Sequence, residues 1–255
     1  MNQKSHKSEI IDQFSKQAIP FARLAGHRDG MQMILEFSGV NKNDIVLDVA
    51  CGPGLVSCEF ARTAKHVTGI DITQKMIAQA VNLQKEKNLG NLTWINSDAI
   101  PLPFPDESFT LVVSRYSFHH FPETRRNLEE MIRVCCRDGR ILVADVSVPE
   151  DKSEAYDRME RMRDPSHMHA LAHDEFADMF MNSGLKGCRQ ASYQVDMELE
   201  AQLKASFPSP GDDARLRKMI ADDIGFDRIG VNAREEDGKV IFTYPISIFM
   251  GEKLI

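Results

Sequence analysis

The sequence predicts an α/β fold with a doubly wound, mostly parallel sheet. Between residues 44 and 146, segments with the apolar pattern of strands alternate with segments of helical periodicity. Such alternation, joined by right-handed crossovers, gives a parallel sheet with helices on both faces. The first strand, residues 44–49, is nearly continuous in apolar side chains, as expected for a strand buried on both faces.

Two short helices are expected ahead of the sheet. Ile10, Phe14 and Ala18 recur at helical spacing, and residues 31–39 repeat the pattern and end on a glycine. Three prolines between residues 101 and 105 exclude regular structure just before the fourth strand. The alternating region predicts strands at 44–49, 66–71, 92–96, 109–114 and 140–146, with helices at 55–64, 73–88 and 122–135.

Beyond residue 150 the alternation stops. The sequence predicts a charged helix to about Arg163, a turn at 164–165, a helix at 174–182, and two late strands at 188–197 and 239–250, seven strands in all. We expect one domain, because 255 residues with 42% hydrophobic side chains can build a single large core. Its parts are N-terminal helices (1–43), a core (44–146), substrate-side helices with a helical lid (151–238) and a final strand (239–255).

Composition and charge restrict the partners of the chain. The formal net charge is −7, with 31 basic and 38 acidic side chains and no basic cluster. A nucleic-acid surface needs Lys and Arg gathered on one face, so none is predicted. No apolar run approaches the ~18 residues of a membrane span. The polar first residues and five cysteines without CxxC spacing favour a cytoplasmic protein without a disulfide framework.

Unusual residues fall where the first three strands end. In a doubly wound sheet the ligand crevice lies at the carboxyl ends of the strands. The first strand runs through Asp48 into a turn with Gly52 and Gly54, whose missing side chains let the backbone approach a ligand. Asp71 ends the second strand, where a carboxylate can accept both hydroxyl protons of a ribose, and Asp98 follows the third, where it can accept from an amino group.

A nicotinamide dinucleotide is the first alternative ligand. Its fingerprint is Gly-x-Gly-x-x-Gly, and Ser57 stands here in place of the third glycine. A carboxylate at Asp48 suits a positively charged or donor-rich group, such as the ammonium of an amino acid, better than a pyrophosphate. An NAD-dependent dehydrogenase is therefore less favoured than a protein whose ligand carries an amino-acid ammonium group.

Several motifs together resemble one family. They are residues 46–54 (VLDVACGPG), 69–71 (GID), 97–99 (SDA), 102–109 (LPFPDESF), 119–121 (HHF), 133–134 (RV) and 138–140 (DGR). In this order and spacing they resemble the class I S-adenosylmethionine-dependent methyltransferases, and most of all the branch related to ubiquinone and menaquinone biosynthesis. The resemblance covers about residues 44–146 and implies the Rossmann-like methyltransferase fold, whose last strand runs antiparallel beside the fifth.

The resemblance implies S-adenosyl-L-methionine as cofactor and S-adenosyl-L-homocysteine as product. It places the two loop glycines beside the methionine, Asp71 on the ribose hydroxyls, and Asp48 near the methionine ammonium through the loop or water. The adenine would lie on Ile72, and Asp98 with Ala99 would bind its amino edge. The other cofactor-side candidates are Ala50, Cys51, Met76, Ser97, Ser114 and Arg115, and Tyr116 would open onto the substrate.

Three departures from the family pattern stand out. Residues 135–140 read CCRDGR where relatives have Leu-Lys-Pro-Gly-Gly, in a loop expected far from the cofactor. Phe21, a substrate-side candidate, stands where relatives often carry a tyrosine that reaches the methionine carboxylate, so that hydrogen bond is in doubt. Ala50 replaces the first loop glycine, as it often does in this branch.

The expected chemistry is an in-line methyl transfer that needs no metal and no covalent residue. A general base helps a protonated nucleophile, and His119 and His120 lie where the family places the methyl group. The polar segment from Arg163 to His169 is a second candidate, because it could fold over the pocket and offer His167 or His169 to the substrate. A zinc site made of these histidines is conceivable, but histidine number alone is poor evidence.

The sequence thus predicts an enzyme that methylates a carbon, oxygen or nitrogen atom of a small molecule. A protein that binds the cofactor or its demethylated product without catalysis is the main alternative. A vacant, His-lined cavity beside the cofactor would favour the enzyme, and a cavity filled by side chains would favour the binder. Neither the methyl acceptor nor the oligomeric state follows from the sequence.

Overall fold

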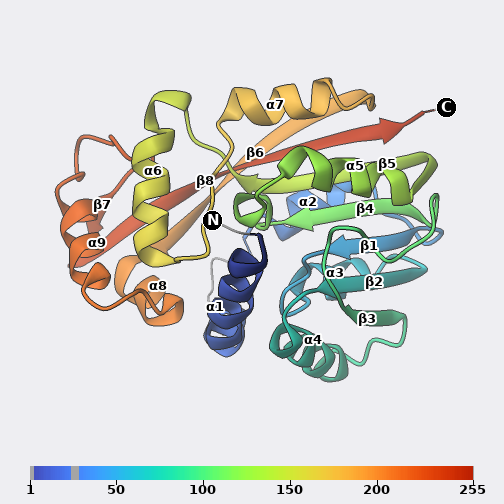
Figure 1. Ribbon diagram of the computed structural model, residues 1–255, viewed down its shortest axis with the longest axis horizontal. Coiled ribbons are helices and arrows are strands. Elements are labelled where there is room, and N and C mark those ends of the chain that lie inside the picture. The colour runs from blue at the N-terminus through green and yellow to red at the C-terminus, as the bar shows by residue number, and fades with distance from the viewer. Residues whose placement is uncertain (1–2, 24–28, 255) are drawn as a thin grey trace.

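A mixed sheet forms the centre of the computed structural model, which describes residues 3–23 and 29–254 (Figure 1). Five parallel strands follow one another in the order β3-β2-β1-β4-β5. They are β1 (Ile45–Val49), β2 (His66–Asp71), β3 (Leu92–Asn96), β4 (Phe109–Arg115) and β5 (Cys135–Val146). This confirms the predicted doubly wound α/β fold, because β1 pairs on one side with β2 and on the other with β4.

The last long strand completes the sheet in the opposite direction. β8 (Lys239–Lys253) lies antiparallel between β5 and β6 (Lys186–Glu198), as the family resemblance implied. A short strand, β7 (Arg234–Glu236), also pairs with β8. The sheet therefore has eight strands, one more than the seven predicted from the sequence.

Alternate side chains of the parallel strands belong to two cores on opposite faces of the sheet. Val46 and Leu111 pack in the core that contains residues of α2 (Met31–Ser38) and α3 (Leu55–Phe60). Leu47 and Val112 pack in the other core. That core is covered by α5 (Thr124–Val134) and α7 (His173–Met181). The alternation explains the near-continuous apolar sequence of these strands.

Several further helices lie beyond the carboxyl ends of the parallel strands. α6 (Glu150–Arg163), α8 (Leu199–Ser206) and α9 (Asp212–Ala221) gather at one end of the molecule (Figure 1). α1 (Gln3–Arg23) crosses the space between α8 and α4 (Gln74–Glu86) and contacts both. A short 3-10 helix, η2 (Phe118–His120), follows β4 and faces the same space.

Most differences from the predicted elements concern their ends. β5 begins at Cys135 and not at residue 140, because Cys135 already pairs with Phe109 ahead of an irregularity in the register. α1 begins at Gln3, earlier than the apolar pattern indicated. The sequence does not predict α8 and α9 as two separate helices. Across the described residues, no helix combines the length and apolar character needed to cross a bilayer.

Candidate functional site

Two adjoining cavities lie at the carboxyl edge of the parallel strands. The large cavity has a volume of about 250 Å³ and the small cavity one of about 70 Å³. Phe14, Tyr116 and His120 line both, so these three side chains form the boundary between them. The large cavity lies over the loop after β1, and the small cavity lies toward α6 and α8.

The loop after β1 has the backbone shape that a close ligand requires. Ala50, Gly52 and Gly54 have positive φ angles of 56°, 53° and 79°. A Cβ atom on Gly52 would meet no heavy atom within 4 Å, so the space above this residue is open. A Cβ atom on Gly54 would lie 2.7 Å from the ring of Trp94, so this glycine is needed for packing.

Asp71 joins the end of β2 to the loop and lines the large cavity. Its Oδ2 accepts the Gly52 N–H at 2.9 Å, and its Oδ1 accepts the Thr73 N–H at 2.7 Å. Burial raises the pKa of this carboxyl group, although both backbone donors oppose the shift. Each oxygen keeps a further lone pair, so the carboxylate can still accept two hydroxyl groups.

Asp48 lies behind the loop and does not line either cavity. Its side chain is buried and accepts a hydrogen bond of 2.5 Å from the Ser57 hydroxyl in α3. Burial raises its pKa to about 7. This carboxyl group therefore connects β1 to α3 beneath the loop, and any effect on a ligand ammonium would have to pass through the loop.

Asp98 lies at the opposite end of the large cavity, where α1 covers it. The Lys7 ammonium forms an ion pair with Asp98, and both residues line the cavity. His6, Ile10 and Phe14 also reach the cavity from α1. The first helix is thus a wall of the site.

Most of the predicted cofactor residues share this cavity. Those that line it are Ala50, Cys51, Gly52, Asp71, Ile72, Met76, Ser97, Asp98, Ala99 and Arg115. Asp48, Gly54 and Ser114 do not. Ser114 is buried, and its hydroxyl donates to the Val49 carbonyl at 2.8 Å, so it joins β4 to β1. The side chain of Phe21 lies outside the described part of the structure.

Tyr116 is held at the boundary between the cavities by its neighbours. Its backbone has a φ of 58°, and its hydroxyl lies 2.9 Å from that of Tyr193. The Arg115 guanidinium donates to the Tyr116 hydroxyl at 2.9 Å and to the carbonyl of Asp29 at 2.8 Å. This cluster fixes the ring that a substrate would meet.

His119 lines the small cavity and is paired with a buried carboxylate. Its Nδ1 lies 2.6 Å from Oδ1 of Asp145, and the backbone N–H groups of Phe118 and His119 donate to Oδ2 of the same residue. Burial is the largest single effect and would lower the pKa of His119, but the charge and hydrogen bond of Asp145, together with the charge of Glu160, outweigh it and raise the pKa. Because Nδ1 donates to a carboxylate, Nε2 of the neutral ring is a proton acceptor.

His120 lines both cavities but has a different environment. Its Nδ1 donates to the carbonyl of Ser166 at 3.0 Å, and the backbone carbonyl of His120 accepts from the His6 ring at 2.9 Å. Burial and the neighbouring His119 ring lower its pKa, so it stays neutral. Its ring makes an edge contact with Phe14 at 5.0 Å between centroids.

The segment from Arg163 to His169 divides between the cavity and the interior. Arg163 lines the small cavity, whereas His167 and His169 line neither cavity. Both histidines turn to Asp157 of α6, His167 through Nε2 and His169 through Nδ1, each at 2.8 Å. These contacts hold the segment against α6. Within residues 3–23 and 29–254, no group of three or more His, Cys, Asp or Glu side chains is placed to hold a metal ion.

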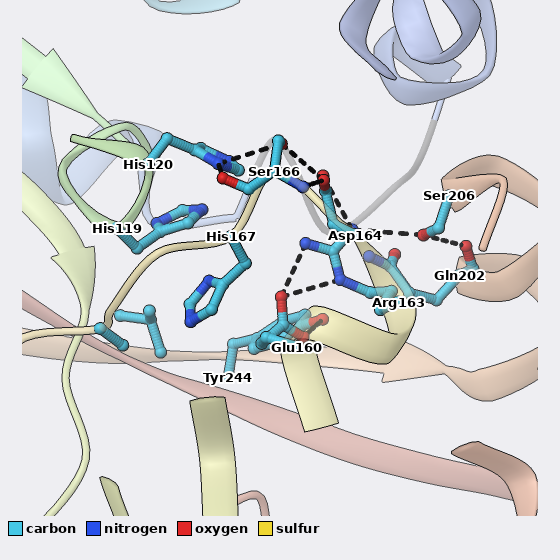
Figure 2. A network of polar contacts seen from close by, with 12 residues as sticks. His119, His120, Glu160, Arg163, Asp164, Ser166, His167, Gln202, Ser206 and Tyr244 are labelled. Atoms are coloured by element: carbon cyan, nitrogen blue, oxygen red, sulfur yellow. Dashed lines mark hydrogen bonds and ion pairs between the residues drawn. The ribbon is translucent and has the colours of Figure 1, made fainter. Parts of the chain in front are cut away.

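A charged network forms the far wall of the small cavity (Figure 2). The Arg163 guanidinium contacts Oε2 of Glu160 at 2.6 Å, and the Tyr244 hydroxyl donates to Oε1 of Glu160 at 2.9 Å. Asp164 accepts from the Ser166 hydroxyl at 2.6 Å and from Gln17 of α1 at 3.1 Å. All of these residues except Ser166 line the cavity.

Sequence reasoning missed the residues that reach the cavities from distant elements. They are His6, Lys7, Ile10 and Gln17 from α1, Glu160 from α6, Gln202 from α8 and Tyr244 from β8. Helical spacing around Ile10 and Phe14 was the one available signal, since this face of α1 also carries Lys7 and Gln17. No local pattern marks a side chain whose importance comes from a partner far along the chain.

Comparisons with known proteins agree with this site. Residues 47–143 match the family described as a methyltransferase domain. The uncharacterized methyltransferase YcgJ of Bacillus subtilis is 36% identical over 137 residues, 53% of this chain and 54% of the relative. The ubiquinone/menaquinone biosynthesis C-methyltransferase UbiE of Yersinia enterocolitica is 31% identical over 137 residues, 51% of this chain and 55% of the relative.

The match thus spans about half the length of these curated relatives. The crystal structure of YcgJ from Bacillus subtilis has the same fold over nearly the whole chain, with a TM-score of 0.81 at 24% identity, covering 90% of this chain and 100% of that one. Residues 47–143 therefore match a methyltransferase domain, and the resemblance to methyltransferases expected from the sequence is confirmed.

Proposed function

We propose that the protein transfers a methyl group from S-adenosyl-L-methionine to a small-molecule nucleophile. The observation that carries this proposal is the pair of cavities: a large one over the glycine loop and a small one beyond Tyr116 and His120. A cofactor in the first could present its methyl group to an acceptor in the second. The net charge of −7 favours a small acceptor over a nucleic acid.

The residues around the large cavity fit this cofactor. Gly52 leaves open space where a methionine moiety would pass, and Asp71 retains lone pairs for two ribose hydroxyl groups. Ile72 and Met76 offer apolar surface to an adenine ring, and Asp98 offers a carboxylate to its amino group. When bound, the cofactor supplies an electrophilic methyl group on a sulfonium.

We assign His119 as the general base that accepts the proton of the nucleophile. Its Nε2 has no hydrogen-bond partner among the described residues, and Asp145 holds the ring in the tautomer that accepts a proton there. His120 lies between the cavities with a lowered pKa and orients the nucleophile as a neutral hydrogen-bond acceptor. His167 and His169 would act only by holding the 164–172 segment in place.

The division of labour along the chain belongs to the same proposal. Residues 44–146 would bind the cofactor, and α6, α8 and α9 within residues 151–238 would enclose the substrate. α1 would cover both sites, because Phe14 lines both cavities. The small His-lined cavity favours an enzyme over a protein that only binds the cofactor.

Calorimetry tests the cofactor assignment. We expect S-adenosylhomocysteine to bind, and Asp71→Ala to weaken binding at least 10-fold because two charge-assisted hydrogen bonds to the ribose are lost. Asp222→Asn, at an exposed carboxylate that ends α9, is the matched control and should bind normally. Binding of NAD with none of S-adenosylhomocysteine would overturn the proposal in favour of a dehydrogenase.

Transfer itself is tested with isotopically labelled methyl donor and a metabolite extract. An enzyme should move the label to at least one extract component, and His119→Asn should slow that transfer by about 100-fold, the usual range for loss of a general base. Cofactor binding without transfer to any component would instead support a non-catalytic binding protein.

A further inference from the structure

The small cavity combines buried negative charge with hydrogen-bond acceptors that have no protein partner. Among the described residues, three carboxylates line it, and Arg163 is the only lining lysine or arginine. The carboxylates are Asp145, Glu160 and Asp164. All three are almost fully buried, so solvent screens them little. The cavity therefore has a negative potential, because three carboxylates surround the single guanidinium of Arg163, which is paired to Glu160 and lies 3.9 Å from Asp164.

Gln202 supplies an independent sign of a ligand. It lies in α8, is 4% exposed and lines the small cavity, and its Oε1 has no hydrogen-bond partner. Its side chain extends toward Arg163 in the network of Figure 2. A buried acceptor left unpaired is unfavourable, so this amide is suited to a ligand that donates an N–H or O–H group.

The two histidines that line the cavity also present hydrogen-bond acceptors to a ligand. Because Nδ1 of His119 and Nδ1 of His120 both donate to oxygen atoms, Nε2 of each neutral ring is left as a hydrogen-bond acceptor without a partner among the described residues. A ligand here has to bring donors. The rest of the wall is apolar and includes Val146, Val195, Met197 and Ile246.

The negative potential of the small cavity distinguishes among the classes of methyl acceptor that carry N–H or O–H donors. A phenol, an enol or a carboxylic acid reacts as an anion, which three buried carboxylates would disfavour. An amine reacts as a neutral nucleophile and becomes positively charged as it is methylated, which the same carboxylates stabilise. The cavity, less than a third of the volume of its neighbour, also limits the acceptor to a small molecule.

We propose that the methyl acceptor is a small primary or secondary amine with an apolar body, bound in the cavity between His119, Glu160 and Gln202. The ammonium form enters and gives one proton to Nε2 of His119. The nitrogen lone pair then forms the N–CH₃ bond while the S–CH₃ bond breaks and its electron pair returns to sulfur. The products are a methylated ammonium and a neutral thioether. This inference rests on the proposed methyl transfer.

The test compares methyl acceptors of similar size that share a benzene ring. Purified protein is incubated with CD₃-labelled cofactor and, separately, with benzylamine, p-cresol and phenylacetate, and products are detected by mass. We expect the amine to gain the label at least 10-fold faster than the other two. Faster labelling of the phenol or the carboxylate, or labelling of carbon, would overturn the inference.

Two variants test the residues. Glu160→Gln should raise the KM for the amine about 10-fold and leave the KM for the cofactor within twofold, because a buried negative charge is lost only from the acceptor cavity. Gln202→Leu provides a second test that does not leave Arg163 unpaired, and it should raise the same KM by several fold. Glu154→Gln is the control: it lies on α6 as well, but its side chain is 96% exposed.

Failure of this inference is distinct from failure of the proposed function. Binding of S-adenosylhomocysteine with no labelling of the amine would reject the amine and leave the methyltransferase intact. Without any binding of S-adenosylhomocysteine, the methyltransferase fails, and calorimetry of benzylamine with wild type, Glu160→Gln and Glu154→Gln still decides whether the cavity takes amines. Equal affinity in all three, or no binding, would reject the amine site.

Discussion

At the scale of single residues, the pair of His119 and Asp145 determines how activity should depend on pH. Asp145 raises the pKa of His119 against the effect of burial. As a base, His119 acts only when neutral, so kcat should rise with pH through its pKa. Asp145→Asn removes the charge that opposes burial. We therefore expect the acid limb of the kcat profile to move to lower pH, with kcat at its plateau reduced 10- to 100-fold because the ring loses its orientation.

The measurement is kcat between pH 5 and pH 9 for wild type, Asp145→Asn and a control, His66→Asn. The ring of His66, at the start of β2, hydrogen-bonds to Thr93, and His66 lines neither cavity, so its replacement should leave the profile unchanged. An acid limb at the same pH in wild type and Asp145→Asn would show that another group titrates.

Three aspartates that look alike in the sequence have different surroundings in the structure. Asp48, Asp71 and Asp98 each end or follow a strand, which correctly predicted that the cavity lies at this edge. The sequence could not show that Asp48 points behind the loop to Ser57, or that Asp98 meets Lys7. Both outcomes depend on which neighbour lies opposite each carboxylate, and that follows only from tertiary packing.

At the scale of elements, α1 is attached to α8 through two glutamines. Gln13 and Gln17 both donate to the carbonyl of Ser206 at the end of α8, and Gln17 also donates to Asp164. Replacing both glutamines by alanine should remove these donors from the Ser206 carbonyl and one donor from Asp164, and so loosen α1. Because α1 lines the large cavity, we expect the affinity for S-adenosylhomocysteine to fall 5- to 20-fold and amide exchange in residues 3–23 to accelerate.

Lys16→Ala is the matched control for this prediction. Lys16 lies on the same helix between the two glutamines in sequence, but it is exposed and forms an ion pair with Asp12 of the same helix. Calorimetry and hydrogen exchange of the two proteins give the comparison. Unchanged affinity in the double variant would mean that α1 is a wall of the site without contributing to binding.

The same helix shows where element prediction reaches its limit. The strands of the core were predicted well, because a strand buried on both faces has an apolar sequence whatever its neighbours are. α1 buries His6, Gln13 and Gln17 and exposes Ile11 and Ile19, so its inward face does not follow the apolar pattern. A polar side chain can be buried when its partners arrive from α8 or η2, and local periodicity does not record those partners.

At the scale of the whole molecule, the buried carboxyl groups at the carboxyl edge of the parallel strands divide into two sets with opposite pKa shifts. One set lies near α6: Asp145 at the end of β5, Asp157 and Glu160 within α6, and Asp164 directly after it. Hydrogen bonds and positive charges lower the pKa values of these four carboxyl groups despite burial. Asp48 and Asp71, beside the loop after β1, have raised pKa values because burial dominates.

The two sets should make the two parts of the molecule respond oppositely to acid. A carboxyl group with a lowered pKa contributes stability above its unfolded value of about 4, and this contribution is lost as the pH falls. A carboxyl group with a raised pKa contributes stability that is complete below about 4 and is lost as the pH rises, through about 7 for Asp48. Acid should therefore weaken α6 and residues 164–172 before it weakens the carboxyl ends of β1 and β2.

Hydrogen exchange, corrected for the intrinsic effect of pH, tests this order. Between pH 7 and pH 3, a loss of about 2 kcal/mol in local stability would accelerate exchange in α6 and residues 164–172 about 30-fold, whereas β1 and β2 should keep their protection. Asp157→Asn should reproduce part of the acceleration at pH 7, because His167 and His169 lose the carboxylate that holds the segment. Glu154→Gln should not, since this exposed side chain forms no contact with the segment. Earlier loss of protection in β1 than in α6 would show that the shifted carboxyl groups do not control acid unfolding, and that the sheet itself is the acid-sensitive part of the protein.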